Sequence, residues 1–150
     1  MVSALQRNST PFHRLTRFVS RQAAAMMFNL EVEEIYLVER WAHIVYIHGK
    51  GVSRFVSYAD FPPRLGVAPP TDKDFAFWQR RWKKRQQGQQ KKQAPPFWVQ
   101  FFACQLRQSS SAEVLFNWGR LIGLIKFAFS EDILQRLRES YAQKRLAVSC

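Results

Sequence analysis

A run of prolines near the middle of the chain most restricts how this sequence can fold. Pro62 and Pro63 follow Phe61, and Pro69 and Pro70 end the same segment. Proline fixes φ and has no backbone N–H to donate, so neither a strand ladder nor a helix can continue through this segment. The secondary structure before it and after it must therefore be inferred separately.

The part before the prolines is rich in β-branched and aromatic residues. Two such runs, 44–47 and 52–58, flank the turn sequence His48-Gly49-Lys50-Gly51. This arrangement predicts an antiparallel hairpin, because glycine adopts positive φ without steric cost. A third run over 35–38 predicts a further strand, although the glutamates within 31–34 fit the start of a helix equally well.

The part after the prolines opens with the signals of a helix start. Thr71 has the side chain of an N-cap, and Asp72 and Asp74 place negative charge in the first turn, where the helix dipole favours it. We therefore expect a helix from about Lys73 to Arg85.

Two further helices are expected at the C-terminal end. Ser110 and Glu113 fit a capping box, and Ser130 precedes two acidic residues at the start of the next apolar pattern. The two helices predict an αα-hairpin with Leu121 in its interior. The segment 97–106 is apolar and aromatic, and its periodicity fits a strand or a helix.

These elements together indicate an α+β fold. It consists of a small antiparallel β-hairpin or sheet, followed by a basic helix and a C-terminal helical hairpin. Residues 23–150 are expected to form a single compact domain, and the polar segment 86–96 to be a flexible basic loop within it.

The N-terminal segment allows two interpretations. The first 30 residues include four arginines and several hydroxyl residues but no acidic side chain, as is typical of a mitochondrial presequence. Residues 1–22 are then a presequence cleaved after Gln22. Alternatively, they are a basic amphipathic helix of the folded protein, with Leu15, Phe18 and Val19 on its apolar side.

The net charge points to a polyanionic partner. The chain has 23 Lys and Arg against 11 Asp and Glu, a formal net charge of +12. Such an excess attracts phosphates and raises the rate of encounter with nucleic acid or an anionic membrane. With 47 % hydrophobic residues, the chain also has enough apolar content to bury a core.

The strongest candidate for a binding site is the helix expected over 73–85. No carboxylate occurs between Phe75 and Ala112, and lysines and arginines are frequent there. Guanidinium groups bind phosphates in bidentate fashion, and aromatic faces stack on unpaired bases. The stripe of Phe75, Trp78 and Trp82 either stacks on bases or faces the core, and such stripes more often face the core. The residues predicted to bind nucleic acid are Arg80, Arg81, Lys83, Lys84, Arg85, Lys91 and Lys92, with Lys50 and Arg54 of the hairpin as a weaker group.

The sequence gives little support to catalysis. It contains no Walker-type loop, no dinucleotide-binding glycine pattern and no nucleophile elbow. Its histidines and cysteines do not have the spacing of metal ligands, so no metal and no cofactor is expected. Cys104 and Cys150 are expected to be free thiols in a reducing compartment.

The function that fits these features is an RNA-binding accessory subunit of a ribonucleoprotein particle, most simply a mitochondrial ribosome, and not an enzyme. Its partners would be ribosomal RNA and neighbouring proteins, its location the mitochondrial matrix, and no small-molecule substrate is expected. One alternative is an accessory subunit of a membrane-bound mitochondrial complex, with basic residues near anionic lipid. Another is a bacterial or phage nucleic-acid-binding protein, which would be cytoplasmic.

Overall fold

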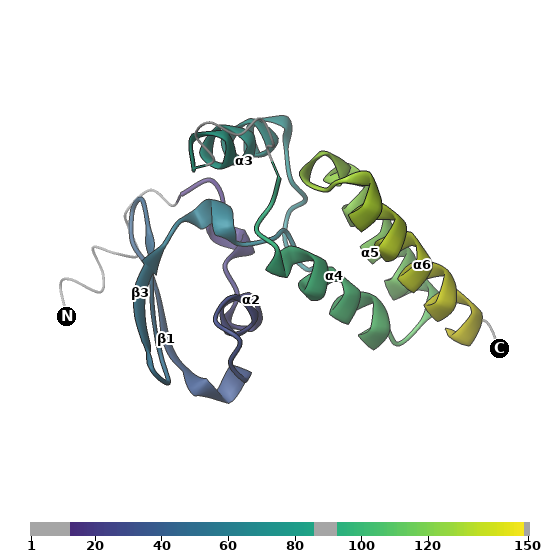
Figure 1. Ribbon diagram of the computed structural model, residues 1–150, viewed down its shortest axis with the longest axis horizontal. Coiled ribbons are helices and arrows are strands. Elements are labelled where there is room, and N and C mark those ends of the chain that lie inside the picture. Colours follow the sequence, from purple (N-terminus) through teal and green to yellow (C-terminus); the bar gives the residue numbers. More distant parts are fainter. Residues whose placement is uncertain (1–12, 86–92, 149–150) are drawn as a thin grey trace. The chain divides into compact units, whose positions relative to one another are not determined.

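The structure divides at the proline segment. The computed structural model describes residues 13–85 and 93–148, and the boundary between its two compact units falls between Pro62 and Pro63 (Figure 1). We call the part before this boundary the sheet unit and the part after it the helical unit. A single compact domain over 23–150 stays a prediction.

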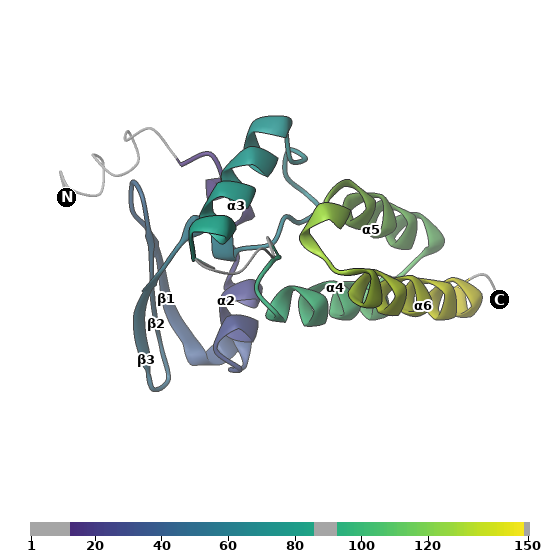
Figure 2. The same cartoon turned by 45° about the horizontal axis from the view of Figure 1, so that its top comes forward.

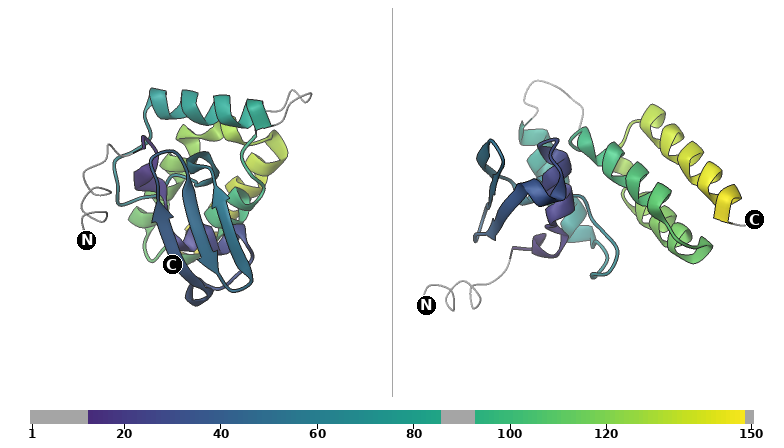
Figure 3. Two further views of the ribbon diagram at one scale, coloured as in Figure 1. Left: turned by 90° about the vertical axis from the view of Figure 1, so that its left-hand side faces the viewer. Right: turned by 90° about the horizontal axis from the view of Figure 1, so that it is seen from below.

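A three-stranded antiparallel sheet forms the centre of the sheet unit. Its strands β1 (Ile35–Arg40), β2 (Val45–Gly49) and β3 (Val52–Val56) lie in the order β1-β2-β3 (Figure 3, left). The predicted hairpin is confirmed, since β2 pairs with β3 across the turn at Lys50 and Gly51. Gly51 has φ +72°, which is the conformation that the turn requires of it.

From residue 13 onward, the segment before the sheet is not one continuous helix, which is what the second interpretation of the N-terminal segment predicts. A 3-10 helix covers Thr16–Phe18, and α2 (Arg21–Met27) starts anew after Ser20. Ser20 has extended backbone, and its hydroxyl accepts a hydrogen bond from the N–H of Ala23 at 3.1 Å. A serine that caps the next helix in this way ends the preceding turn, because its backbone leaves the helical region.

Residues of this N-terminal segment nevertheless lie in the interior of the sheet unit. Leu15, Phe18 and Val19 are at most 1 % exposed. Two arginines bind backbone carbonyl groups across the unit: Arg21 donates to Ile35 and Arg40 donates to Val19. Helix α2 packs beside β1 and contributes buried alanines to the same core (Figure 1).

The helical unit contains α3 (Asp72–Arg85), α4 (Phe97–Gln108), α5 (Ala112–Leu124) and α6 (Glu131–Val148). The predicted αα-hairpin is α5 and α6, and α4 packs against both of them (Figure 2). The ambiguous segment 97–106 is therefore helical. A further 3-10 helix, Lys126–Ala128, connects α5 to α6.

The caps of the hairpin agree with the sequence prediction at one helix and differ at the other. Ser130 Oγ accepts from the N–H of Ile133 at 3.3 Å, as expected. Helix α5 is capped by Ser111 and not by Ser110, because Ser111 Oγ accepts from the N–H of Val114. Three consecutive serines offer the same cap chemistry, and only the backbone conformation selects among them.

The α+β fold class is thus confirmed: a small antiparallel sheet is followed by a basic helix and a C-terminal helical hairpin. Leu121 is 4 % exposed in the interior of that hairpin. Among the helices of the described ranges, none has the length and apolar composition needed to cross a membrane.

Candidate nucleic-acid interface

Helix α3 begins with the cap that the sequence predicts. The Thr71 N–H donates to Asp74 Oδ2 at 2.9 Å, and the Asp74 N–H donates to Thr71 Oγ1 at 3.3 Å. This reciprocal pair satisfies two backbone donors that the first turn leaves without a helical partner. These two hydrogen bonds stabilise the start of the helix.

The aromatic side of α3 faces the interior of the helical unit. Trp78 and Trp82 are 0 % and 1 % exposed, and both meet the ring of Trp98 on α4 edge to face, at centroid distances of 5.8 and 5.1 Å. Phe75 contacts Phe127 at 5.3 Å. The stripe of aromatic residues consequently serves as core, and its tryptophan rings are not available to stack on bases.

The cations of α3 lie outside the aromatic stripe, with Arg80, Lys83 and Lys84 on the opposite side and Arg81 flanking the stripe. Arg80, Arg81, Lys83 and Lys84 are all exposed, within five consecutive residues. The guanidinium group of Arg80 lies over the Phe77 ring at 5.8 Å, a cation–π contact that limits its rotamers. We call these four residues the α3 basic face.

Three of the predicted site residues cannot be placed on this face. Arg85 is the last residue of α3, and its side chain lies outside the described part of the structure. Lys91 and Lys92 belong to the segment 86–92, which is also outside the described residues, as is most of the predicted basic loop. The end of that loop is held by the Ala94 N–H, which donates to the Ala128 carbonyl oxygen at 3.0 Å.

The weaker predicted group, Lys50 and Arg54, belongs to the sheet unit. Lys50 Nζ lies 3.3 Å from Glu34 Oε2, and the Lys50 N–H donates to the Glu34 carbonyl oxygen at 2.9 Å. Two contacts lower the pKa of Glu34. The larger effect comes from the hydrogen bond that the Glu31 N–H donates to its carboxylate, and the smaller from Lys50. Lys50 is thus engaged in holding the turn, which makes it a weaker phosphate ligand than the cations of α3.

The positive charge of the chain is unevenly divided between the two units. Residues 1–62 contain 7 Lys and Arg against 5 Asp and Glu, a net charge of +2, whereas residues 63–150 contain 16 against 6, a net charge of +10. Most of the attraction for a polyanion therefore originates in the helical unit, which also carries the α3 basic face.

The sequence interpretation missed the exposed face of the sheet. Trp41 and Phe55 are 45 % and 49 % exposed and meet edge to face at 5.0 Å, and Tyr46 contacts the same Phe55 ring at 5.1 Å. Trp41 Nε1 also donates to Glu39 Oε1 at 2.6 Å. The alternation of Val45 and Ile47 with Tyr46 could have revealed this face, because alternate residues of a strand point to opposite sides.

Within the described ranges, no three His, Cys, Asp or Glu side chains come together as a metal site. Cys104 is a half-buried free thiol on α4, and Cys150 lies outside the described residues.

Comparison of the chain with protein-family models, with curated proteins and with solved structures finds no match.

Proposed function

We propose that this chain is an RNA-binding accessory subunit of a ribonucleoprotein particle, with a mitochondrial ribosome as the particle that best fits the sequence. The α3 basic face is the observation that carries the proposal. Arg80, Arg81, Lys83 and Lys84 are exposed together on a helix whose other side is anchored by buried tryptophans. Cations on a rigid support lose little conformational entropy when they bind phosphates.

The charge distribution supports a nucleic acid over a small anionic ligand. The helical unit has a net charge of +10, spread over many side chains, whereas a small anion is bound by a few convergent groups in a cavity. RNA is favoured over duplex DNA only by the presequence-like composition of the N-terminal segment.

The buried position of the N-terminal segment favours the bacterial or phage nucleic-acid-binding protein as a second candidate. Cleavage after Gln22 would remove Leu15, Phe18 and Val19 from the interior of the sheet unit. This burial supports a role for the segment in the folded protein, and under the second candidate no mitochondrial location is required. A reporter fused to residues 1–30 distinguishes the two: import into mitochondria supports the ribosomal proposal, and a cytosolic signal supports the second candidate.

Salt-dependent RNA binding tests the proposal directly. Replacing the four residues of the α3 basic face by Gln should weaken binding to single-stranded RNA. It should also reduce the slope of log affinity against log salt by up to about 3, at roughly 0.7 per phosphate contact. Gln is a good helix former, so α3 should remain folded.

The matched control replaces four cations of the same unit by Gln: Arg107, Arg136, Lys144 and Arg145. This variant has the same net charge as the first. If both lose affinity equally, binding follows net charge and α3 is not the interface. If neither the wild-type chain nor the control responds to salt, apolar contacts dominate, as expected for a subunit of a membrane-bound complex.

A further inference from the structure

A groove of about 390 Å³ runs between α5 and α6 of the helical unit. Its lining comes from both helices, over Phe116 to Gly123 on α5 and over Leu134 to Tyr141 on α6, and from Lys126 beyond α5. Each of these spans covers seven residue steps, or about 10 Å at 1.5 Å per residue. The groove is therefore about two helical turns long.

Two glycines give the groove its shape. Gly119 lies so close to the ring of Tyr141 that a Cβ would be 2.6 Å from Tyr141 Cε2, which brings the two helices together at that point. One turn later, a Cβ at Gly123 would meet no atom within 4 Å. The helices are thus close at Gly119, and the space beside Gly123 is open to a ligand.

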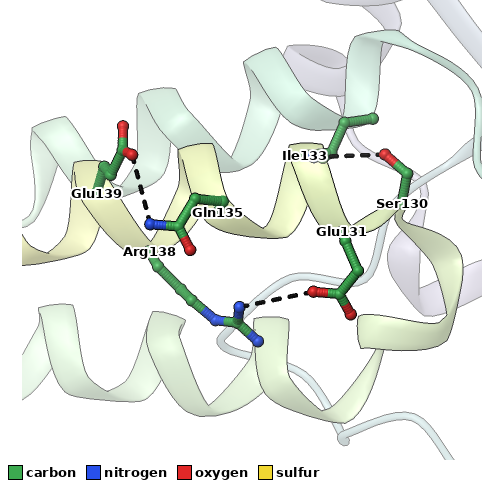
Figure 4. A network of polar contacts seen from close by, with 6 residues as sticks. All are labelled: Ser130, Glu131, Ile133, Gln135, Arg138 and Glu139. Atoms are coloured by element: carbon green, nitrogen blue, oxygen red, sulfur yellow. Dashed lines mark hydrogen bonds and ion pairs between the residues drawn. The ribbon is translucent and has the colours of Figure 1, made fainter.

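The floor of the groove is apolar and its rim is cationic. Leu134 and Leu137 are 7 % and 3 % exposed. The charged lining residues are Arg120, Lys126 and Arg138. None of the described residues that line the groove carries a carboxylate. The nearby Glu131 lies 3.9 Å from Arg138, and both extend from the same side of α6 (Figure 4).

The rim also carries an exposed aromatic side chain. Phe116 is 54 % exposed, and the Arg120 guanidinium group lies over its ring at 5.9 Å. Aromatic side chains are enriched in protein–protein interfaces, so an exposed phenylalanine beside an apolar groove is consistent with a surface that binds a partner protein.

We propose that this groove binds an acidic amphipathic helix of a partner protein. The helix would place apolar side chains at positions i, i+3 or i+4, and i+7 on the floor, and carboxylates beside the three cations of the rim. A span of seven residue steps matches the spacing of these anchors. A bound acyl chain would remain exposed along the open side, and an RNA strand would leave the leucine floor without an apolar partner. The proposal is independent of RNA binding by α3.

The probe for this proposal is a synthetic fluorescein-labelled helical peptide with Leu at i, i+3, i+4 and i+7 and Glu on the flanks. Binding to the full chain is measured by fluorescence anisotropy at several salt concentrations. The control peptides carry Lys in place of Glu, or Ser in place of Leu. We expect the Glu peptide to bind and both controls to bind at least tenfold more weakly, a difference of about 1.4 kcal/mol.

Two substitutions locate the peptide on the protein. Gly123→Leu fills the open space and should weaken binding of the Glu peptide at least tenfold, while the thermal stability of the chain is kept or raised, because Leu favours a helix more than Gly does. Arg138→Glu should weaken binding, whereas Arg136→Glu, which makes the same charge change on α6 outside the groove, should leave it unchanged.

Several results would overturn the proposal. The Glu peptide could fail to bind below about 1 mM, the weakest affinity of interest. It could bind the wild-type and Gly123→Leu chains equally, or bind no better than the Lys peptide. If dodecanoate binds in a Gly123-sensitive manner and the peptide does not, the groove takes an anionic lipid and not a helix.

Discussion

The rings of Trp82 and Trp98 meet nearly at right angles, with their centroids 5.1 Å apart and an interplanar angle of 81°. This contact joins α3 to α4, and both rings are at most 1 % exposed. Edge-to-face packing of this kind adds to the gain from burial itself, because the positive edge of one ring meets the negative face of the other. The contact holds the α3 basic face on the helical unit.

The first prediction concerns this anchor. Trp82→Ala should lower the free energy of unfolding of the helical unit by about 3 to 5 kcal/mol, because it leaves a large cavity in the interior. It should also weaken RNA binding. Chemical denaturation followed by circular dichroism measures the first effect. Trp41→Ala, at a tryptophan 45 % exposed on the sheet, is the control and should cost much less. Equal losses would mean that Trp82 is not an anchor.

The second prediction concerns the N-terminal segment. Phe18 is fully buried, so Phe18→Ala in the full chain should destabilise the sheet unit by about 3 to 5 kcal/mol. Arg14→Ala, at an exposed neighbouring residue, should have little effect. Mass spectrometry of the protein isolated from cells identifies its N-terminus. A mature protein that begins at Ala23 and retains the stability of the full chain would contradict a structural role for this segment.

The third prediction compares two glycines. A Cβ at Gly49 would lie 2.7 Å from the backbone oxygen of Glu34, which accepts a hydrogen bond from the Lys50 N–H and cannot easily move. Gly49→Ala should therefore cost about 1 to 3 kcal/mol. Gly123→Ala meets open space on a helix and should stabilise by about 0.5 to 1 kcal/mol. Denaturant midpoints give both values, and the same sign for the two variants would refute the assigned packing.

The fourth prediction is a pH dependence at Tyr58. Burial of the Tyr58 phenol raises its pKa above the ordinary value of 10.0, because the phenolate would lose its hydration. Its hydroxyl donates to the Trp41 carbonyl oxygen, and its ring stacks on His13 at 4.1 Å. The folded state thus favours the neutral form, and the associated stability is complete below pH 10 and is lost as pH rises through the folded pKa.

The measurement is the denaturant midpoint of the wild-type chain and of Tyr58→Phe between about pH 8 and 11. Tyr58→Phe should be less stable at pH 8, by about 1 kcal/mol for the lost hydrogen bond, and should lose less stability as pH rises. Parallel decreases in the two proteins would show that Tyr58 does not contribute to alkaline unfolding.

Local chemistry explains which elements could be predicted. Thr71 and Ser130 cap helices as expected, and Gly51 supplies the positive φ of the hairpin turn. These features depend on neighbours a few residues away. The sequence prediction does not distinguish the helix over 97–106 from a strand, although its buried residues Trp98, Phe101, Phe102 and Leu106 follow the i, i+3, i+4, i+8 spacing of a helix. Phe97 and Val99, which are apolar but only half-buried, obscure this period in the sequence.

The candidate site shows the same limit. The sequence locates the cations of α3, but the roles of the neighbouring tryptophans depend on where α4 lies. Lys50 likewise has a side chain that can bind phosphate. Its ion pair with Glu34 forms only because the hairpin turn lies beside the segment that precedes β1. The charge of a side chain can be read from the sequence, whereas its availability to bind a ligand depends on the residues that surround it in the folded structure.

The sequence alone determined that strands and helices end at the proline segment 61–70, that a hairpin precedes this segment, and that most of the positive charge follows it, because backbone restriction and charge are properties of single residues. Only the tertiary structure decided that Phe18 belongs to a core, that Trp82 is buried beneath the α3 basic face, and that Gly123 opens a groove on α5. Each of these depends on contacts between segments distant in sequence, and burial is a consequence of such contacts and not of composition.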